Sequence, residues 1–377
     1  MAPMPLAQHL ARQEAPFWPR FSEEIEPMHI STFRQVSCIL AASLSCLFAN
    51  AALADTATAD TVSMNPADPT YFGHYAPELP ATVARKPTLD PKTGLSVQEV
   101  KPDLFYVTDG MYQSAFLVTD AGVVLFDVPK TFARKLPAVI ARKAPGKNVV
   151  VLIYSHDHAD HIGGSGVFAD VPGLRVITSG RVAEGLAKDA YPSVIAPTQT
   201  FEGHLDLPVG GVDIQLDTVS YHSESEDVIA YIPKLKFLMA IDSITPGEVP
   251  FMNFGATSDF GHYLGVFDTL LNYEFDLLMA GHISILGTRQ DVVNSRDYAY
   301  DVRDTVLREM KMMFPRFEKI YASAHFVNGN LAYRMTIESM RDECAAQIID
   351  RWSKRMSVTD VWADSHCETA ILYYIMH

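Results

Sequence analysis

The chain has 377 residues, of which 48% are hydrophobic, and its mean hydropathy is +0.05. These values exclude a largely disordered protein and leave room for one large hydrophobic core or two modest ones. The formal net charge is −15 and the sequence contains no basic stripe, so we predict that nucleic acid is not a partner.

The first 54 residues predict an N-terminal extension that ends in a secretory signal peptide. An apolar run over residues 36–49 leads to small residues that end at Ala54, which suits a small-x-small cleavage site. The run is short for a membrane span, although a membrane anchor is the competing interpretation. Met28 gives a shorter and less acidic start than Met1. We therefore predict a periplasmic or secreted protein with no stable membrane anchor after cleavage.

Residues 55–95 predict an extended arm. Six prolines interrupt this segment, and proline fixes φ and removes a backbone donor, so little regular structure is expected. We expect the arm to wrap the core or a partner subunit. The sequence leaves a homo-oligomer open.

Residues 96–290 predict an α/β core. Strand hairpins come first and a helix at 137–143 follows, after which strands and helices alternate in two successive halves. This alternation is typical of sheets covered by helices.

One motif in this core combines three imidazoles and two carboxylates. It is the run His156-Asp157-His158-Ala159-Asp160-His161, which directly follows the apolar strand 149–154 and precedes two glycines. Burying so many ionisable groups without an ion is costly, so we predict a metal site rather than a polar loop that happens to contain histidines. Imidazole and carboxylate together favour zinc, and manganese or iron also fit these ligand types.

Three further candidate ligands follow apolar strands in the same way. They are His222, Asp242 and His282. Each has an ordinary interpretation when taken alone, as a solvated loop histidine or a turn residue. Their shared position at the carboxyl ends of strands is where open sheets place their binding sites. A carboxylate at Asp242 could bridge two cations.

The aromatic residues after Asp242 are candidates for a wall beside the substrate. They are Phe251, Phe254, Phe260 and Tyr263, and the alternative is that they fill the core between a loop and a helix. Tyr221 and Asn253 are candidate catalytic donors to a developing oxyanion.

Residues 291–377 predict a helical C-terminal extension. Apolar residues recur there at helical spacing, and Gly329 marks a break between two helical stretches. Cys344 and Cys367 remain after signal cleavage, and their spacing alone leaves a disulfide between them open.

From about Val97 to about Thr288 the chain resembles the metallo-β-lactamase superfamily, because the histidine motif and the three later ligands occur in the order of that family. The resemblance implies a four-layer αββα sandwich with two zinc ions per chain. It implies a first zinc held by His156, His158 and His222, a second held by Asp160, His161 and His282, and Asp242 between them. Asp127, at a strand end beneath the motif, is expected to support a ligand or to form a plain turn.

We therefore predict a zinc-dependent hydrolase of a small-molecule substrate. A hydroxide shared by the two zinc ions would attack an ester, lactone or amide carbonyl, and Asp160 would orient it and relay its proton. A lactonase or carboxylesterase is favoured. The alternatives are a β-lactamase, a phosphotriester or sulfate ester hydrolase, and a non-enzymatic periplasmic zinc-binding protein.

Overall fold

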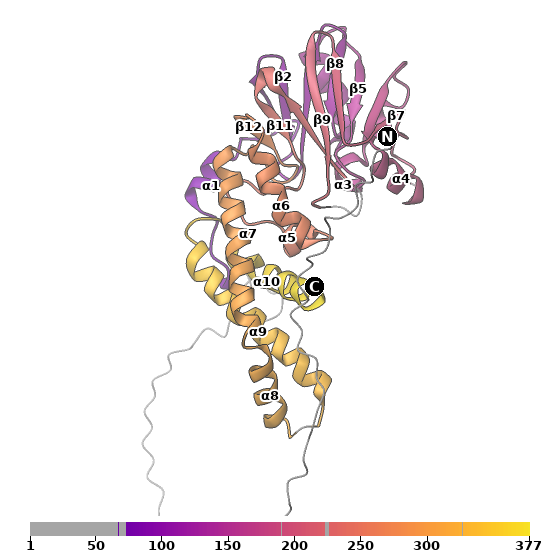
Figure 1. Ribbon diagram of the computed structural model, residues 1–377. Helices are drawn as coiled ribbons and strands as arrows, with labels where there is room; N and C mark the ends of the chain where they lie inside the picture. The colour runs from indigo at the N-terminus through magenta and orange to yellow at the C-terminus, as the bar shows by residue number, and fades with distance from the viewer. Residues whose placement is uncertain (1–66, 68–72, 190, 223–225, 326) are drawn as a thin grey trace, which may run out of the picture. The chain divides into compact units, whose positions relative to one another are not determined.

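Two β-sheets pack face to face (Figure 1). In this computed structural model, residues 67, 73–189, 191–222, 226–325 and 327–377 are described. The first sheet contains, in spatial order, β1 (Ser96–Lys101), β2 (Leu104–Thr108), β3 (Gln113–Thr119), β4 (Gly122–Phe126), β5 (Val149–Ile153), β6 (Arg175–Ser179) and β7 (Gln199–Phe201). The second contains β12 (Leu277–Met279), β11 (Phe237–Met239), β10 (Asp227–Ile232), β9 (Val212–Val219) and β8 (His204–Val209).

Hydrophobic strands explain why both sheets are buried. Strands β1 to β4 pair antiparallel, whereas β4 to β7 pair parallel, and β5 reads Val-Val-Val-Leu-Ile. In the second sheet β8 to β11 pair antiparallel and β11 pairs parallel with β12. Val, Ile and Leu along both sheets fill the layer between them, because each sheet buries one face against the other.

Helices cover the outer faces of both sheets. Helices α2 (Leu136–Lys143) and α4 (Gly180–Asp189) lie on the first sheet, and α6 (Phe260–Leu271) and α7 (Arg289–Met310) lie on the second. Single turns of 3-10 helix occupy Ala133–Lys135, Ser165–Phe168 and Pro233–Leu235. The predicted four-layer αββα sandwich is confirmed, and so is the helix expected at 137–143.

The C-terminal segment is helical, as predicted, and packs into the same compact unit as the sheets. After α7 come α8 (Met313–Ser323), α9 (Gly329–Trp352) and α10 (Thr359–Met376). Asn328 caps α9 by accepting a hydrogen bond from the backbone N–H of Leu331, at the predicted break. A disulfide joins Cys344 of α9 to Cys367 of α10. Both helices share a hydrophobic core with α6 and α7.

The described part of the predicted arm contains a short helix, α1 (Pro80–Arg85), and lies along the chain's own core. The hydroxyl of Thr82 donates to the carbonyl of Gly247, and the N–H of Leu79 donates to Ser357. The predicted signal peptide, with the apolar run 36–49, lies outside the described residues. Among the residues that are described, no helix has both the length and the apolar character of a membrane span.

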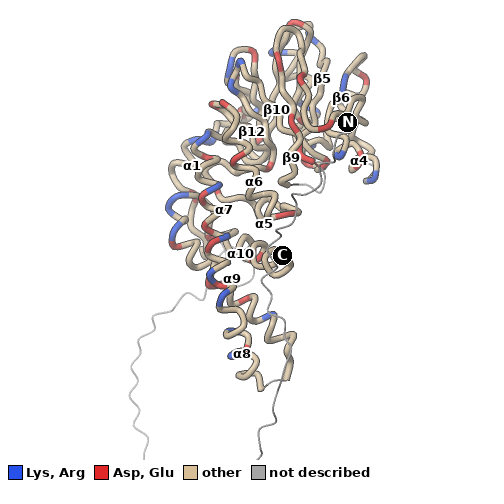
Figure 2. The backbone as a smooth tube through the Cα atoms, in the orientation of Figure 1, with Lys and Arg blue, Asp and Glu red and all other residues tan. Residues whose placement is uncertain are grey.

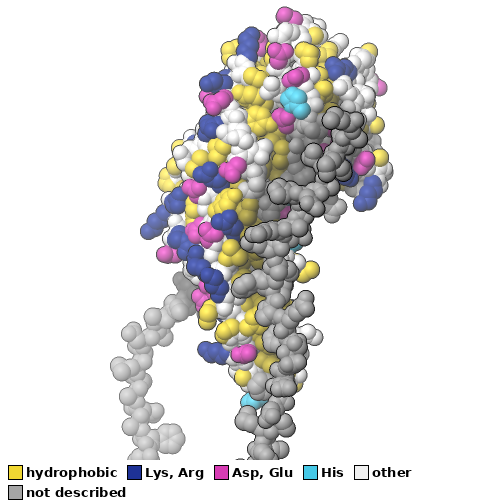
Figure 3. Space-filling view, in the orientation of Figure 1, with side chains coloured by type: hydrophobic (Ala, Val, Ile, Leu, Met, Phe, Trp, Pro, Cys, Tyr) yellow, Lys and Arg dark blue, Asp and Glu magenta, His cyan; other side chains and the backbone are white. Residues whose placement is uncertain are grey.

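Charged side chains of both signs alternate over the described surface. Figure 2 shows Lys and Arg interspersed with Asp and Glu along α7 and α9. In the space-filling view these charged groups are spread among hydrophobic side chains on the visible face (Figure 3). This mixture agrees with the composition, in which acidic residues outnumber basic ones by 45 to 30.

One ion pair ties the arm to α7 and should make folding stability depend on pH. Arg85 donates to both carboxylate oxygens of Asp291, at 2.8 and 2.9 Å. Burial raises the pKa of Asp291, but hydrogen bonds from Arg85 and Thr288 outweigh this effect and lower the pKa below its usual value. A carboxyl group with a depressed pKa stabilises the folded state above its ordinary pKa, and this contribution is lost as pH falls through the folded value.

We expect Arg85→Gln to reduce the free energy of unfolding at pH 7 by about 2 kcal/mol, because a buried carboxylate loses its charged donor. Urea unfolding at pH 7 and at pH 3 measures this, with the exposed Arg142→Gln on α2 as control. The difference from wild type should be smaller at pH 3, because the stabilisation from the depressed pKa of Asp291 decreases once pH falls below the ordinary pKa of the carboxyl group. A difference of the same size at both pH values would contradict the assignment.

Candidate metal centre

Seven side chains from both sheets meet at one end of the sandwich. The loop after β5 and helix α3 (Ala159–Ile162) carry four of them, and the ends of β9, β11 and β12 carry one each. Their ligand atoms form two groups, within each of which all atoms lie within 4.8 Å of one another. The first group is His156, His158, His222 and Asp242, and the second is Asp160, His161 and His282.

Asp242 connects the two groups. Its Oδ2 lies 3.2 Å from Nε2 of His222 in the first group and 3.1 Å from Nε2 of His161 in the second. Its Oδ1 lies 3.3 Å from Nε2 of His282. Asp242 has a left-handed backbone (φ 61°), which is rare for a residue other than glycine and occurs at functional sites.

The remaining contacts keep each group close together. In the first group, Nε2 of His222 lies 3.1 Å from Nδ1 of His158. In the second, Nε2 of His161 and Nε2 of His282 lie 3.2 Å apart, and each is 3.5 Å from Asp160 Oδ2. The structure thus brings His156, His158 and His222 together in one group and Asp160, His161 and His282 in the other.

Charge and burial in this cluster fit a divalent cation. Burial raises the pKa of Asp242, but the imidazoles of His161, His282 and His222 lower it well below the usual range, so this carboxyl is ionised. Burial lowers the pKa of His156, which keeps that ring neutral. Nε2 of His156 and Oδ1 of Asp242 are buried without a hydrogen-bond partner among the described residues. A neutral imidazole at His156 and an ionised carboxylate at Asp242, each with an open lone pair, are metal-ligand types, and a bound cation would displace the protons that Asp242 favours on the rings around it.

Ser155 and Asp127 orient the first histidine. The hydroxyl of Ser155 lies 3.0 Å from Nδ1 of His156, and Nε2 of that ring faces Asp242 and is positioned to hold a metal ion. Asp127 in turn accepts the backbone N–H of Ser155 at 2.8 Å. The burial of Asp127 raises its pKa to about 6. Asp127 thus supports a ligand through Ser155, which agrees with the first of the two roles predicted for it.

Asp227 plays a similar part for His222. It is buried, and its Oδ2 accepts the backbone N–H groups of Tyr221 and His222 at 3.1 and 3.0 Å. These bonds fix the end of β9, where the chain leaves the sheet.

Gln113 and Gly281 fix the loop that carries His282. The buried amide of Gln113 accepts hydrogen bonds from the N–H groups of Ala280 and Gly281, and its nitrogen contacts the carbonyl of His282 at 2.8 Å. Gly281 has φ +91°, and a Cβ there would meet Cγ2 of Ile241 at 2.6 Å and Cε1 of His161 at 2.9 Å. Only glycine fits this close approach.

A cavity of about 460 Å³ opens beside the seven side chains. Five of the ligands line it, together with apolar side chains from four segments of the chain. The apolar lining residues are Met111, Tyr112, Val249, Phe251, Ala256, Ile283 and Trp362. Among the described residues that line this cavity there is no Lys or Arg, and Glu248 is the only acidic one apart from the ligands.

The three predicted catalytic residues lie in different surroundings. Asp160 lines the cavity, as expected. Tyr221 is buried, and its hydroxyl donates to the carbonyl of Ile241 at 2.6 Å, so the predicted oxyanion contact is wrong for this residue. Asn253 does not line the cavity, and its backbone N–H donates to Ser365 on α10 at 3.1 Å. The prediction for Asn253 is therefore corrected as well.

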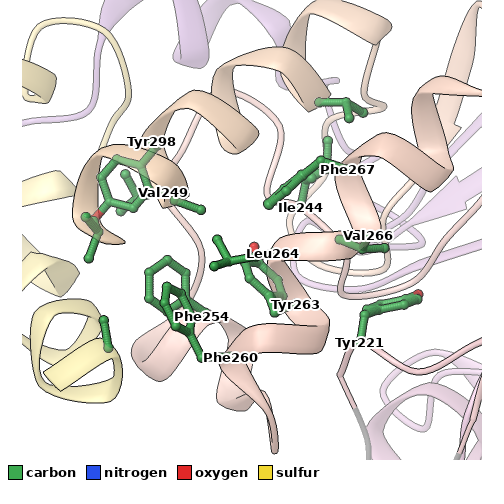
Figure 4. Packing of buried hydrophobic residues seen from close by; sticks show 14 of the residues in the cluster. Tyr221, Ile244, Val249, Phe254, Phe260, Tyr263, Leu264, Val266, Phe267 and Tyr298 are labelled. Carbon is green, nitrogen blue, oxygen red and sulfur yellow. The ribbon is translucent and has the colours of Figure 1, made fainter. Parts of the chain in front are cut away.

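Of the four aromatic residues predicted to form a wall beside the substrate, one lines the cavity and three are buried. Phe251 lines the cavity and is 53% exposed, whereas Phe254, Phe260 and Tyr263 are buried. Figure 4 shows Phe254 and Phe260 lying against each other within the core. Tyr112, Gln113 and Trp362 were not identified from the sequence, because each stands in a segment without a motif.

Residues 108–282 match the family model described as the metallo-beta-lactamase superfamily. The chain carries a metallo-β-lactamase domain. The match ends at His282, the last of the seven side chains, and includes all the others. The subfamily is unresolved.

Two curated relatives are similar to the domain. The chain is 25% identical over 204 residues to the 2,4-dinitroanisole O-demethylase subunit alpha of Nocardioides sp. (strain JS1661). This alignment covers 52% of this chain and 60% of the relative. The chain is 26% identical over 168 residues to the metallo-beta-lactamase type 2 of Elizabethkingia meningoseptica. This alignment covers 41% of this chain and 64% of the relative. The chain thus spans about three fifths of these relatives.

A solved structure supports the fold. The stereoselective inverting sec-alkylsulfatase Pisa1 from Pseudomonas sp. superposes with a TM-score of 0.53 at 16% identity, over 81% of this chain and 54% of that one. At this identity the likeness concerns the fold alone.

We expect Ser155→Ala to lower the metal affinity of the metallo-β-lactamase domain by about tenfold, because His156 loses the partner that fixes its ring. Competition with a chromogenic chelator measures the affinity. Ser357→Ala, which removes a buried hydroxyl far from the ligands in sequence, is the matched control. Equal affinity in Ser155→Ala and wild type would show that Ser155 does not orient the ligand.

Proposed function

We propose that this chain is a metal-dependent hydrolase that holds two zinc ions and cleaves uncharged esters or lactones with an apolar group. The observation that carries the proposal is the cavity that five of the seven potential ligands line together with apolar and aromatic side chains. Manganese or iron would suit the same ligand types.

Two divalent ions at these side chains would supply Lewis acidity and lower the pKa of bound water. Side chains of the protein would hold these ions and position the reacting water. Asp242 holds the two ligand groups together from its buried position, whereas Asp160, whose side chain is 38% exposed, is the more exposed of the two carboxylate ligands that line the cavity. Asp160 would orient the attacking water and carry its proton toward the leaving group.

The lining of the cavity argues for an uncharged substrate. A carboxylate, sulfate or phosphate group would find no Lys or Arg among the described lining residues. Aromatic and aliphatic side chains instead offer contact to an apolar group. This ranks lactones and carboxylesters above β-lactams that carry a carboxylate and above sulfate esters.

Hydrolysis of an aryl methyl ether is a second candidate. One relative is named as a subunit of a 2,4-dinitroanisole O-demethylase, and that compound is an uncharged aromatic ether. The aromatic lining of this cavity suits such a ring. Water would cleave the ether to a phenol and methanol without an oxidant.

Turnover by wild type and by Asp160→Asn at matched zinc occupancy tests the proposal. Metal analysis should give close to two zinc ions per chain. The zinc-loaded wild type is screened against aryl esters, lactones, β-lactams, phosphotriesters, a sulfate ester and 2,4-dinitroanisole. We expect uncharged esters or lactones to react fastest and Asp160→Asn to lower kcat by about 10²-fold, because the proton relay is lost.

Each other outcome has a definite meaning. Equal turnover by the two proteins would refute the relay by Asp160. Fastest turnover of an anionic substrate would refute the inference from the cavity lining. No turnover of any compound by fully loaded wild type would favour a non-enzymatic zinc-binding protein.

We further propose that the chain is exported. The support is the signal-like segment that ends at Ala54, together with the disulfide between Cys344 and Cys367, since disulfides persist in oxidising compartments. Mass spectrometry of the protein from periplasmic or culture fractions should give a mature N-terminus near Asp55. An intact N-terminal segment on cytoplasmic protein would overturn this proposal.

A further inference from the structure

The wall of the cavity contains an unusual run of backbone conformations. In the short helix α5 (Met252–Ala256), four successive residues have left-handed φ values of 56°, 56°, 75° and 62°, and only the third, Gly255, is a glycine. Left-handed backbone is unfavourable for residues with a Cβ. Such a run persists only where its surroundings hold it.

Helix α10 supplies the contacts that hold α5. Nε2 of His366 donates to the carbonyl of Phe251 at 3.1 Å, and Ser365 Oγ accepts the N–H of Asn253 at 3.1 Å. The ring of Phe254 stacks on the imidazole of His366, with centroids 4.3 Å apart. In Figure 4, Phe254 lies next to the yellow ribbon of the C-terminal helices.

His366 is itself fixed on all sides. It is fully buried, and its Nδ1 accepts the hydroxyl of Tyr298 on α7 at 2.7 Å. Burial lowers its pKa to about 4, so the ring is neutral at physiological pH and carries its proton on Nε2, toward Phe251. The neighbouring residue Cys367 anchors this turn of α10 to α9.

The segment held in this way reaches both the cavity and the metal ligands. Phe251 and Trp362 both line the cavity, and their rings meet edge to face with centroids 4.9 Å apart. At the other end of the segment, the N–H of Ser258 donates to the carbonyl of His222 at 3.1 Å. A Cβ on Gly255 would lie 3.6 Å from the carbonyl oxygen of Asp242.

We propose that helix α10 determines which substrates this site accepts, with Trp362 contacting the apolar group of the substrate and His366 acting as a positioning residue for Phe251. Both aromatic rings and five of the seven ligands line the same cavity. A substrate bound at the ligands therefore occupies a space that α10 helps to form. This inference rests on the proposed function for its substrate class, but the role of His366 can be tested without turnover.

Hydrogen exchange in the zinc-loaded full chain tests the positioning role. The N–H groups of Gly255 and Thr257 donate to the carbonyls of Phe251 and Asn253 within the left-handed run. We expect His366→Phe, which keeps a stacking ring but has no donor, to speed exchange at residues 251–257 by about tenfold, the equivalent of one hydrogen bond.

A conservative variant separates positioning from general loosening. His366→Gln keeps a donor that can reach the Phe251 carbonyl and should restore most of the protection, while exchange in β5 and β10 stays at the wild-type level in both variants. Unchanged exchange at 251–257 in His366→Phe, or equal acceleration throughout both sheets, would overturn the positioning role.

Ligand binding and turnover test the selection of substrate. Calorimetry with the zinc-loaded protein compares 2-acetonaphthone, an uncharged ketone with a large apolar group, with acetone. We expect Trp362→Ala to weaken binding of the naphthyl ketone by about tenfold, whereas Phe314→Ala, which removes an exposed aromatic ring on α8, leaves it unchanged. The ketones are not hydrolysed, so this result does not depend on the proposed reaction.

Turnover is compared between a naphthyl ester and a methyl ester. In both Trp362→Ala and His366→Phe, kcat/KM for the naphthyl ester should fall about tenfold more than kcat/KM for the methyl ester. His366→Gln should restore the wild-type ratio. An unchanged ratio between the two esters, or unchanged ketone binding in Trp362→Ala, would overturn the role of α10. If wild type binds the naphthyl ketone through Trp362 but hydrolyses no ester, the proposed function fails while the binding role of α10 stands.

Discussion

The buried carboxylate of Asp242 is the constraint on which the rest of the site depends. An ionised group without solvent is tolerated only where opposite charge and donors surround it. Here imidazoles from three separate loops converge on its two oxygens, and one of these oxygens has no hydrogen-bond partner among the described residues. A cation satisfies both the carboxylate and the imidazole lone pairs. The left-handed backbone at this residue and the glycine at position 281 both follow from the need to bring these loops together.

Buried polar side chains around the metal-ligand residues hold those residues in place. Ser155, Asp227 and Gln113 are all buried, and each binds a ligand ring or the backbone of a ligand loop. Because a buried polar group that lacks its partner is costly, these side chains and the loops they hold stabilise each other. The ligands are therefore positioned before any substrate arrives.

Much of the ligand set could be predicted from the sequence because four of its residues follow a repeated local rule, in which a ligand stands three residues after the end of a strand. His156, His222, Asp242 and His282 all obey it. The cavity wall could not be predicted in the same way. Tyr221 and Phe251 both stand near ligands in the sequence, yet one is buried against a backbone carbonyl and the other faces the cavity. Phe251 is held by contacts with α10, more than 100 residues later, and no local sequence pattern contains such a contact.

The two sides of the cavity also differ in when they can form. The seven ligands precede residue 283, and both sheets that align them precede α7, whereas Trp362 and His366 follow about 80 residues later on a helix tied by a disulfide. During synthesis the seven side chains can therefore come together before the cavity wall does. The disulfide between Cys344 and Cys367 then covalently secures the helix that completes the wall. In such a protein the metal centre and the selectivity of the cavity would mature as separate events.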